Sequence, residues 1–354
     1  MKNTGLSLLI VALLCSAAFA ANENADSTKQ LDQLEQTIYG NVRTGGMISR
    51  LDDIEKALYG TKLEGSLAER QSAHIDFLEN GSNGQPSLLY KTSVAEWGLG
   101  IYNNADKPLM ERIPIIEKKL EESALDSKPL AMRVERALGL IFTDPVSVST
   151  AEVPAGTVVR MQLMETLKPA TTKKGDHVLF RITHNVMVGN TLVVPVGAPA
   201  SGVVTSVKKP GFFGRPSEIK ISVDSIKTLG SAELPLIEGS ASKEATEFEA
   251  TYAAAAGTSL VGAIVLGPVG LVSGFFIRGN AKEVPAGSIL YAETKEPVSI
   301  AGYPVPDSLK EQTAETQYVD LIQNKKVSLS KSDAAAKSAD VKEKSVKTTE
   351  IDNL

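Results

Sequence analysis

The feature that most constrains the fold of this chain is a repeat of 20 or 21 residues that runs through residues 27–143. The stretch LDQLEQTIYG, which begins at Leu31, returns as LDDIEKALYG beginning at Leu51. Apolar residues recur four, seven and eleven positions after the start of a unit, which places them on one face of an α-helix. The repeat therefore predicts a series of short amphipathic helices. The expected helix starts are Met47, Leu67, Leu88, Leu109 and Leu130, and the basic residues three positions later are Arg50, Arg70, Lys91, Arg112 and Arg133.

A single helix of this kind cannot bury its own apolar face. Neighbouring units are therefore expected to stack on one another or on a second chain. We expect the array to act as a spacer or an oligomerisation stalk, and a ligand-binding array is the alternative. The repeated basic residues are expected to face solvent or to pair with Glu55, Glu96 or Glu117. The glycine-containing linker over 81–86 is expected to divide the array into two halves.

Beyond residue 145 the apolar residues change to an alternation of period two. This alternation, together with V-P-x-G turns at 153–156, 194–197 and 284–287, indicates antiparallel strands with one buried face. Residues 146–302 are therefore predicted to form an antiparallel β sandwich or small barrel, which places the whole chain in the α+β class. The alternating residues include Val159, Met161, Leu163, Val178, Phe180 and Ile182.

The first 20 residues have the features of a secretory signal peptide. Lys2 provides a positive start, residues 6–14 are apolar, and an A-x-A site predicts cleavage between Ala20 and Ala21. The only cysteine, Cys15, lies inside this segment. The chain is therefore expected to be exported to the periplasm or outer envelope of a bacterium, and to fold there without disulfide bonds.

An apolar insert of 28 residues over 250–277 contains no charged residue. A membrane helix needs about 20 apolar residues, so this length is sufficient to cross a bilayer. Three arrangements remain open: a Gly-rich helical hairpin inserted in a membrane, a segment that covers the sheet, and a full span. The residues expected to contact a membrane or partner are Leu260, Val261, Gly262, Ile264, Val265, Leu266, Gly267, Pro268, Gly270, Gly274, Phe275 and Phe276.

A second candidate contact is the loop GFFGRP over 211–216. Its side chains Phe212, Phe213 and Arg215 either fold back at a hairpin tip or contact a partner. The end of the chain, residues 303–354, is rich in Lys, Ser and Ala. It is predicted to be mostly disordered, because such a composition cannot offset the entropy lost on ordering.

The composition argues against catalysis and metal binding. The chain has one cysteine and three histidines, and it contains no spacing typical of a known catalytic or metal motif. His177 and His184 would face opposite sides of one strand, so they cannot share a metal ion. The formal charge of −5 gives no general attraction for nucleic acid. We therefore expect no catalytic residue, no cofactor, no metal and no nucleic-acid partner.

The β half resembles a known order of strands and turns. An A-G-T turn at 155–157 is followed by a G-x-x-V strand over 175–186, by V-V-P-x-G-A and G-V-V over 193–204, and by a strand and turn over 219–236. This order is similar to the C-terminal β domain of the outer-membrane core subunit of type IV secretion and conjugation machines. In that family an apolar helical hairpin interrupts the β domain and crosses the outer membrane. The resemblance implies the same role for the insert over 250–277.

These observations lead to a functional expectation. We expect an exported, non-enzymatic structural or interaction protein of the cell envelope, which forms homo-oligomers through its helical repeats. It would associate with a membrane or an envelope partner through the β domain and its insert. The alternative is a soluble periplasmic binding module for a wall polymer or glycan, in which the insert only covers the sheet.

Overall fold

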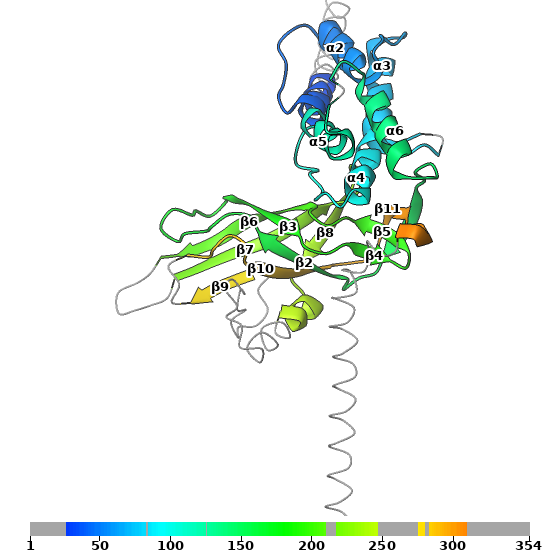
Figure 1. Ribbon diagram of the computed structural model, residues 1–354. Helices are drawn as coiled ribbons and strands as arrows, with labels where there is room; N and C mark the ends of the chain where they lie inside the picture. The colour runs from blue at the N-terminus through cyan, green and yellow to red at the C-terminus, as the bar shows by residue number, and fades with distance from the viewer. Residues whose placement is uncertain are drawn as a thin grey trace, which may run out of the picture.

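The structure is a computed structural model that describes residues 26–82, 84–124, 126–209, 217–246, 275–279 and 283–309. Within these residues an N-terminal array of helices packs on a C-terminal set of antiparallel strands (Figure 1). The predicted α+β class and the order of its two parts are confirmed.

The array contains one helix for each repeat unit. Every predicted start is the first residue of a helix. The residues that precede the starts have ψ values between 146° and 162°, the extended geometry of an N-cap, and Ser66 completes a capping box with Glu69. The helices are the one over 26–39, α2 (Met47–Tyr59), α3 (Leu67–Ile75) with its π-helical continuation η1 (Asp76–Asn80), α4 (Leu88–Gly98), α5 (Leu109–Glu121) and α6 (Leu130–Ile141).

The apolar faces of these helices meet in one core inside the chain. Leu51, Ile54 and Leu58 of α2 are fully buried, and so are Ile113 and Ile116 at the equivalent positions of α5. Stacking of the units on one another is therefore what the structure shows. The helices of one chain supply the partner that each apolar face needs, so a contact between copies would have to use another surface.

The β domain consists of a closed barrel and a smaller sheet, and all its strand pairs are antiparallel. Its strands are β1 (Ser149–Val153), β2 (Val158–Leu163), β3 (His177–Ile182), β4 (Val186–Val188), β5 (Thr191–Val194), β6 (Pro199–Lys208), β7 (Ser217–Lys227), β8 (Glu233–Ile237), β9 (Phe275–Gly279), β10 (Ile289–Thr294) and β11 (Val298–Pro304). The barrel has the order β6-β3-β2-β10-β8-β7, and β7 pairs back to β6. The smaller sheet has the order β1-β11-β5-β4. Of the two predicted architectures, the small barrel is the one formed.

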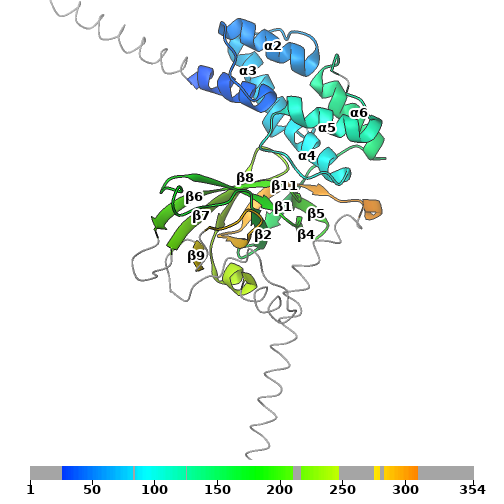
Figure 2. The ribbon, with the colours of Figure 1, turned by 60° about the vertical axis from the view of Figure 1, so that its left-hand side comes forward.

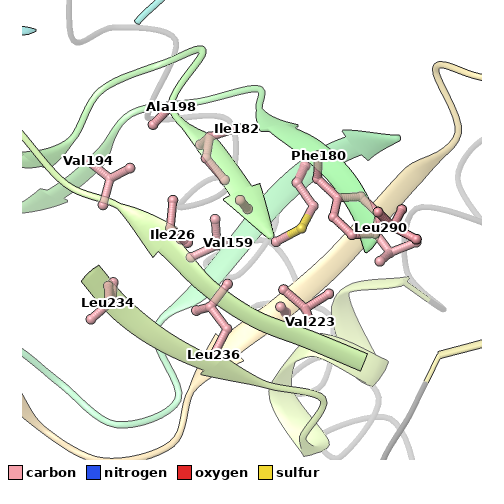
Figure 3. Close-up of a cluster of buried hydrophobic side chains, with 14 of the residues drawn as sticks. Val159, Phe180, Ile182, Val194, Ala198, Val223, Ile226, Leu234, Leu236 and Leu290 are labelled. Carbon is pink, nitrogen blue, oxygen red and sulfur yellow. The ribbon is translucent and has the colours of Figure 1, made fainter. Parts of the chain in front are cut away.

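The barrel interior is filled by alternate residues of its strands (Figure 3). Phe180 and Ile182 of β3, Val159 of β2 and Leu290 of β10 point into it and are buried. The predicted alternation is thus the inward face of the barrel. Where β6 meets β7, the register shifts between Ser201 and Gly202. The ring closes at this strand pair.

The array and the β domain share one apolar core. Leu192 of β5, Tyr303 of β11 and Val305 are buried among the helical residues. Trp97 of α4 packs edge-on against Tyr303, with the ring centroids 5.8 Å apart. Figures 1 and 2 both show α4 at this junction. The helical array is therefore fixed on the smaller sheet.

Two predicted boundaries change. The apolar insert was expected to run as a helical segment to residue 277, but residues 275–277 belong to β9, whose backbone pairs with β7. The β domain was expected to end at residue 302, but β11 continues to Pro304 because Tyr303 pairs with Leu192 of β5. Helix 240–246 precedes the insert. No helix among the described residues combines the length and apolar character needed to cross a membrane.

Candidate functional site

Four of the repeated arginines form buried ion pairs with glutamates of the preceding helix. In each pair the arginine Nε donates to Oε1 and Nη2 donates to Oε2, at distances of 2.6–3.0 Å. This bidentate geometry matches the planar guanidinium fork to the carboxylate. We call this series the Arg–Glu ladder, and its rungs are Arg50–Glu35, Arg70–Glu55, Arg112–Glu96 and Arg133–Glu117.

The ladder distinguishes the two arrangements expected for the repeated basic residues, which were exposure to solvent and pairing with a glutamate. Pairing with Glu55, Glu96 and Glu117 is confirmed, whereas exposure to solvent is wrong for the four arginines, which are all buried. Glu35 is a further partner, outside the three glutamates that were expected. A buried guanidinium needs a partner for its charge, and the fixed spacing of the repeat puts a carboxylate of the previous helix within its reach.

The ladder is interrupted between α3 and α4, where the linker was predicted to divide the array. Ile75 stands where the two preceding and the two following units carry the glutamate, and the base of the next unit is Lys91. Lys91 Nζ instead lies 2.5 Å from Glu135 Oε1 on α6. The array thus consists of two three-helix halves, over 26–80 and 88–141.

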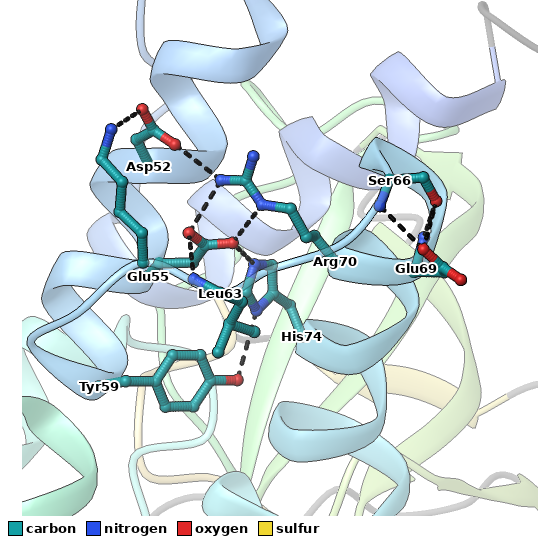
Figure 4. A network of polar contacts seen from close by, with 9 residues as sticks. Asp52, Glu55, Tyr59, Leu63, Ser66, Glu69, Arg70 and His74 are labelled. Atoms are coloured by element: carbon teal, nitrogen blue, oxygen red, sulfur yellow. Dashed lines mark hydrogen bonds and ion pairs between the residues drawn. The ribbon is translucent and has the colours of Figure 1, made fainter.

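The second rung encloses a buried histidine (Figure 4). His74 Nε2 lies 3.3 Å from Glu55 Oε1 without making a hydrogen bond, and His74 Nδ1 lies 3.3 Å from Tyr59 Oη. Burial lowers the pKa of His74, although the charge of Glu55 acts in the opposite direction. Burial raises the pKa of Glu55, but hydrogen bonds from Arg70 and from the Leu63 amide outweigh it, so this pKa lies below its ordinary value.

These shifts predict that acid weakens the array. As the pH falls through 6.5, the ordinary pKa of histidine, His74 becomes protonated in unfolded chains but stays neutral in folded ones, because its pKa is lower there. The free energy of unfolding should then fall by up to about 1.4 kcal/mol per pH unit. Replacing His74 with glutamine should remove this slope between pH 7 and pH 5.5, as measured by urea denaturation. His177→Gln, at an exposed histidine, is the matched control. Identical slopes for wild type and His74→Gln would contradict the prediction.

The third rung also fixes the loop over 101–107, which joins α4 to α5. Glu96 Oε2 accepts hydrogen bonds from Asn103 Nδ2 at 3.0 Å and from the amide of Asn104 at 3.2 Å. The same oxygen receives Arg112 Nη2 at 2.8 Å. One buried carboxylate therefore connects the ladder to the loop.

The barrel holds the same loop from its other side. Arg181 Nη1 donates to the carbonyl oxygens of Asn103 and Gly197 at 2.7 and 2.8 Å, and Nη2 contacts both oxygens of Asp106 at 2.9 and 2.8 Å. Gly197 has a φ of +84°, and a Cβ atom there would lie 2.6 Å from the Tyr102 Cβ. The loop therefore lies directly on the barrel, and only glycine fits at this contact.

A cleft of about 710 Å³ lies where this loop meets β2 and β3. We call it the junction cleft. Among the described residues that line it there is no Asp or Glu. Its walls therefore combine positive and neutral polar groups with exposed apolar ones. The residues that matter for its chemistry are Tyr102, Asn104, Arg160, Gln162, Met164 and His184.

Hydrogen bonds join the polar groups of the junction cleft to one another. Arg160 Nη1 donates to Thr183 Oγ1 at 3.1 Å. The Thr183 hydroxyl in turn donates to the carbonyl oxygen of Arg160 at 3.1 Å. His184 Nδ1 lies 2.9 Å from the same hydroxyl. The hydroxyl thus links two neighbouring strands, and its hydrogen is engaged in the bond to the Arg160 carbonyl oxygen. No group of three or more His, Cys, Asp or Glu residues in the described part of the chain could hold a metal ion.

No sequence motif marks the residues of the junction cleft. The spacing of His184 and His177 excludes a shared metal ion, and Arg160 and Tyr102 belong to no recognised motif. The available signal was weak: Arg160 and Gln162 occupy the polar positions of a strand whose other residues are buried. Such positions face outward on every half-buried strand, so the pattern alone does not mark a site.

Most residues predicted to form a site lie outside the described part of the chain. These are the cleavage pair Ala20 and Ala21, the loop residues Phe212, Phe213 and Arg215, and the insert from Leu260 to Gly274. Phe275 and Phe276 are described as part of β9. No known protein family matches the chain, and no curated protein is significantly similar to it.

Proposed function

We propose that this chain is an exported, non-enzymatic structural or interaction protein of the cell envelope. The observation that carries the proposal is the junction between the array and the barrel. Glu96 and Arg181 hold the loop over 101–107 from both sides, and Tyr303 extends the helical core into the smaller sheet. Such a unit has one fixed shape, which suits the positioning of a partner. The signal-like features of residues 1–20 support export.

Attachment to a membrane or an envelope partner is assigned to the apolar insert. The last three residues of the insert belong to β9, which pairs with β7 outside the ring of six barrel strands. Closure of the barrel therefore does not require β9. An uncharged segment of this length needs a cover, because a large exposed apolar surface favours aggregation in water. The cover can be a membrane, a partner or the domain itself.

Deleting residues 253–272 and joining the ends with a short Gly-Ser linker tests this assignment. The deletion spares β9 and helix 240–246. We expect the barrel to stay folded, because the entropy cost of closing a loop depends only weakly on its length. We also expect a carbonate wash to leave the wild type in the membrane fraction, and the deletion variant to be absent from that fraction. Fractionation of cells and the thermal melting curve give the two readouts.

A charge substitution provides the control. Leu266→Lys should abolish membrane retention, since a central lysine costs about 2.5–3.5 kcal/mol on insertion scales. Ala334→Lys adds the same charge outside the insert and should change nothing. A wild-type protein that is wholly soluble without detergent, combined with a deletion variant that unfolds, would overturn the membrane assignment.

The second candidate function is a soluble periplasmic binding module for a wall polymer or glycan. The junction cleft favours it, because a concave surface with several polar side chains and an exposed aromatic ring is typical of a ligand site. In this case the insert covers the domain. Solubility of the wild-type chain, together with unfolding of the deletion variant, would support this candidate.

Two further expectations remain proposals. The resemblance to the outer-membrane core subunit of type IV secretion machines supports a membrane role for the insert. Among the described residues, a contact between copies can use exposed apolar side chains such as Ile48 and Met132, since the apolar faces of the helices are buried within one chain. The mass of the purified protein in solution tests this, and Ile48→Ser with Met132→Ser should reduce it to that of one copy.

A further inference from the structure

We infer that the end of the barrel remote from the helical array docks on a membrane surface of anionic phospholipid through a cluster of exposed lysines. The inference rests on the proposed membrane attachment, and it names the lipid class and the face of the barrel that meets the lipid. It comes from three observations: where these lysines lie in the fold, which of them make ion pairs, and how the apolar insert joins the same face. We call this face the lysine end, and its residues are Lys168, Lys173, Lys174, Lys208 and Lys209.

The lysine end is formed by two segments that lie side by side. One is the loop over 164–176, which joins β2 to β3 and bonds to β6 where it ends. The amide of Gly175 donates to the carbonyl oxygen of Val204 at 2.8 Å, and the amide of Val204 donates to the carbonyl oxygen of Asp176 at 2.9 Å. The other segment is the end of β6, which carries Lys208 and is followed by Lys209. The lysines of both segments therefore belong to one surface.

This surface lies at the opposite end of the barrel strands from the helical array (Figures 1 and 2). The loop over 164–176 precedes the start of β3, whereas Arg181, near the end of β3, bonds to the loop of the array. Lys208 lies opposite the start of β7, whereas Ser231, beyond the end of β7, donates to the carbonyl oxygen of Glu79 on η1 at 3.1 Å. The 11 residues of β7 span about 33 Å. A membrane at the lysine end would therefore leave the array pointing away from the bilayer.

Most of these lysines are not neutralised by a carboxylate. Lys208 Nζ lies 2.8 Å from a carboxylate oxygen of Glu218, and Lys168 Nζ lies 3.6 Å from one of Glu283. Three others are exposed and make no ion pair within the part of the chain that the structure describes: Lys173, Lys174 and Lys209. Their charges are available to a surface outside the chain.

The acidic residues of the loop over 164–176 do not cancel these charges. The loop contains Glu165 and Asp176 beside its three lysines. The carboxylate of Asp176 accepts a hydrogen bond from the amide of Lys173 at 2.7 Å, so it stabilises the turn of the backbone. Several unpaired ammonium groups on one surface attract an anionic membrane, and the attraction grows with each lysine that comes near it.

The apolar insert identifies the anion as lipid. The insert ends in β9, which pairs with β7 from Phe275, opposite Ile221, to Gly279, opposite Ser217. This is the end of β7 that also lies opposite Lys208. An insert held by a bilayer would therefore keep the lysine end within reach of the headgroups. An apolar anchor and a basic patch together give the two signals that stable membrane attachment needs, whereas a site for a soluble polyanion needs no apolar segment beside it.

Binding of the full chain without its signal segment to lipid vesicles tests the inference. One set of vesicles contains phosphatidylcholine alone, and the other contains phosphatidylcholine and phosphatidylglycerol in equal amounts. The wild type should bind the mixed vesicles at least about tenfold more tightly than the neutral ones, because each lysine near an anionic surface adds to the attraction. Raising the salt concentration should reduce this preference. Cosedimentation over a range of lipid concentrations measures both effects.

A triple variant locates the preference at the lysine end. Lys173→Gln, Lys174→Gln and Lys209→Gln together should reduce the preference for mixed vesicles to about twofold or less. The melting temperature should stay close to that of the wild type, because these side chains make no ion pair within the described residues. The matched control, which should bind as the wild type does, carries the same change at three exposed lysines of the array: Lys118, Lys119 and Lys128.

Four results would overturn the inference, and they separate it from membrane attachment itself. Equal binding of the wild type to the two kinds of vesicle would refute the lipid class while leaving attachment through the insert intact. Equal loss of preference in the two triple variants would show that net charge, and not the lysine end, is the cause. Heparin that binds the wild type as tightly as the mixed vesicles do, but does not bind the lysine-end variant, would show a site for soluble polyanions. Absence of binding to either kind of vesicle would refute both the inference and the membrane attachment on which it rests.

Discussion

Replacing Glu96 with alanine is expected to lower the free energy of unfolding by about 3–5 kcal/mol, because it leaves the charge of Arg112 buried without its carboxylate. Both side chains of this rung are 1% exposed, so water cannot replace the lost partner. The variant also loses the hydrogen bonds that hold Asn103 and Asn104. Urea denaturation followed by fluorescence of Trp97, the only tryptophan and the neighbour of Glu96, measures the effect.

Two further variants show whether the unpaired charge is the cause. Glu135→Ala removes the exposed partner of Lys91 and should cost only about 0–1 kcal/mol. Glu96→Met combined with Arg112→Leu replaces the rung by apolar groups and should recover much of the stability lost in the single variant. The explanation is wrong if Glu96→Ala costs no more than Glu135→Ala, or if the double variant is less stable than Glu96→Ala.

The helices could be predicted closely because their signals are local. Each start combines a change from linker to apolar periodicity with a residue such as Ser66 or Pro108, which adopts N-cap geometry without help from the rest of the fold. The glycine after α2, Gly60, ends that helix with a φ of +80°. These signals act within a few residues, so one sequence is enough to read them.

The Arg–Glu ladder could not be predicted from local signals alone. The sequence displays the repeated arginine, but whether that arginine is buried, and with which glutamate it pairs, depends on how the neighbouring helix packs beside it. The spacing of the two residues is the sequence signal for this pairing. A glutamate precedes the arginine of the next unit by 15 residues in the first half of the array and by 16 in the second. The exception, with Ile75 and Lys91, falls at the linker. A repeated pair at constant spacing is therefore a stronger sign of burial than a repeated charge alone.

The junction cleft could not be predicted from the sequence. Tyr102 and Arg160 lie 58 residues apart and belong to different parts of the fold. They line one cavity only because Gly197 lets the loop over 101–107 lie on the barrel. A glycine in a V-P-x-G turn is explained by the backbone conformation of the turn. Nothing in the turn itself indicates that a loop from the helical array packs there.

The choice between a sandwich and a barrel depended on one strand pair. The alternation of Val178, Phe180 and Ile182 marks a buried face in either architecture. Pairing of β6 with β7 closes the ring, and it does so through register shifts next to Gly202. Bulges of this kind bend a strand and allow closure, but the alternation pattern does not reveal which strands they will join.

Gly202→Val is expected to destabilise the barrel strongly. A Cβ atom at this position would lie 2.4 Å from the Ser222 carbonyl oxygen on β7 and 3.1 Å from Phe180 Cε2 in the barrel core. Neither neighbour can move away cheaply, because one is backbone of the closing strand pair and the other is a fully buried aromatic ring. Forcing extra atoms into a packed interior costs about 1–3 kcal/mol, and separation of β6 from β7 adds the loss of their hydrogen bonds.

Gly230→Val provides the comparison for this prediction. Gly230 lies between β7 and β8, its φ is not in the left-handed region, and no atom lies within 4 Å of where its Cβ would be. The same substitution there should therefore leave the melting temperature close to that of the wild type. Gly202→Val should lower it by several degrees and increase hydrogen exchange of the β6 and β7 amides first, because the closing pair is where the strain enters. Equal melting temperatures for the two variants would mean that the ring does not depend on this close approach of backbone to backbone.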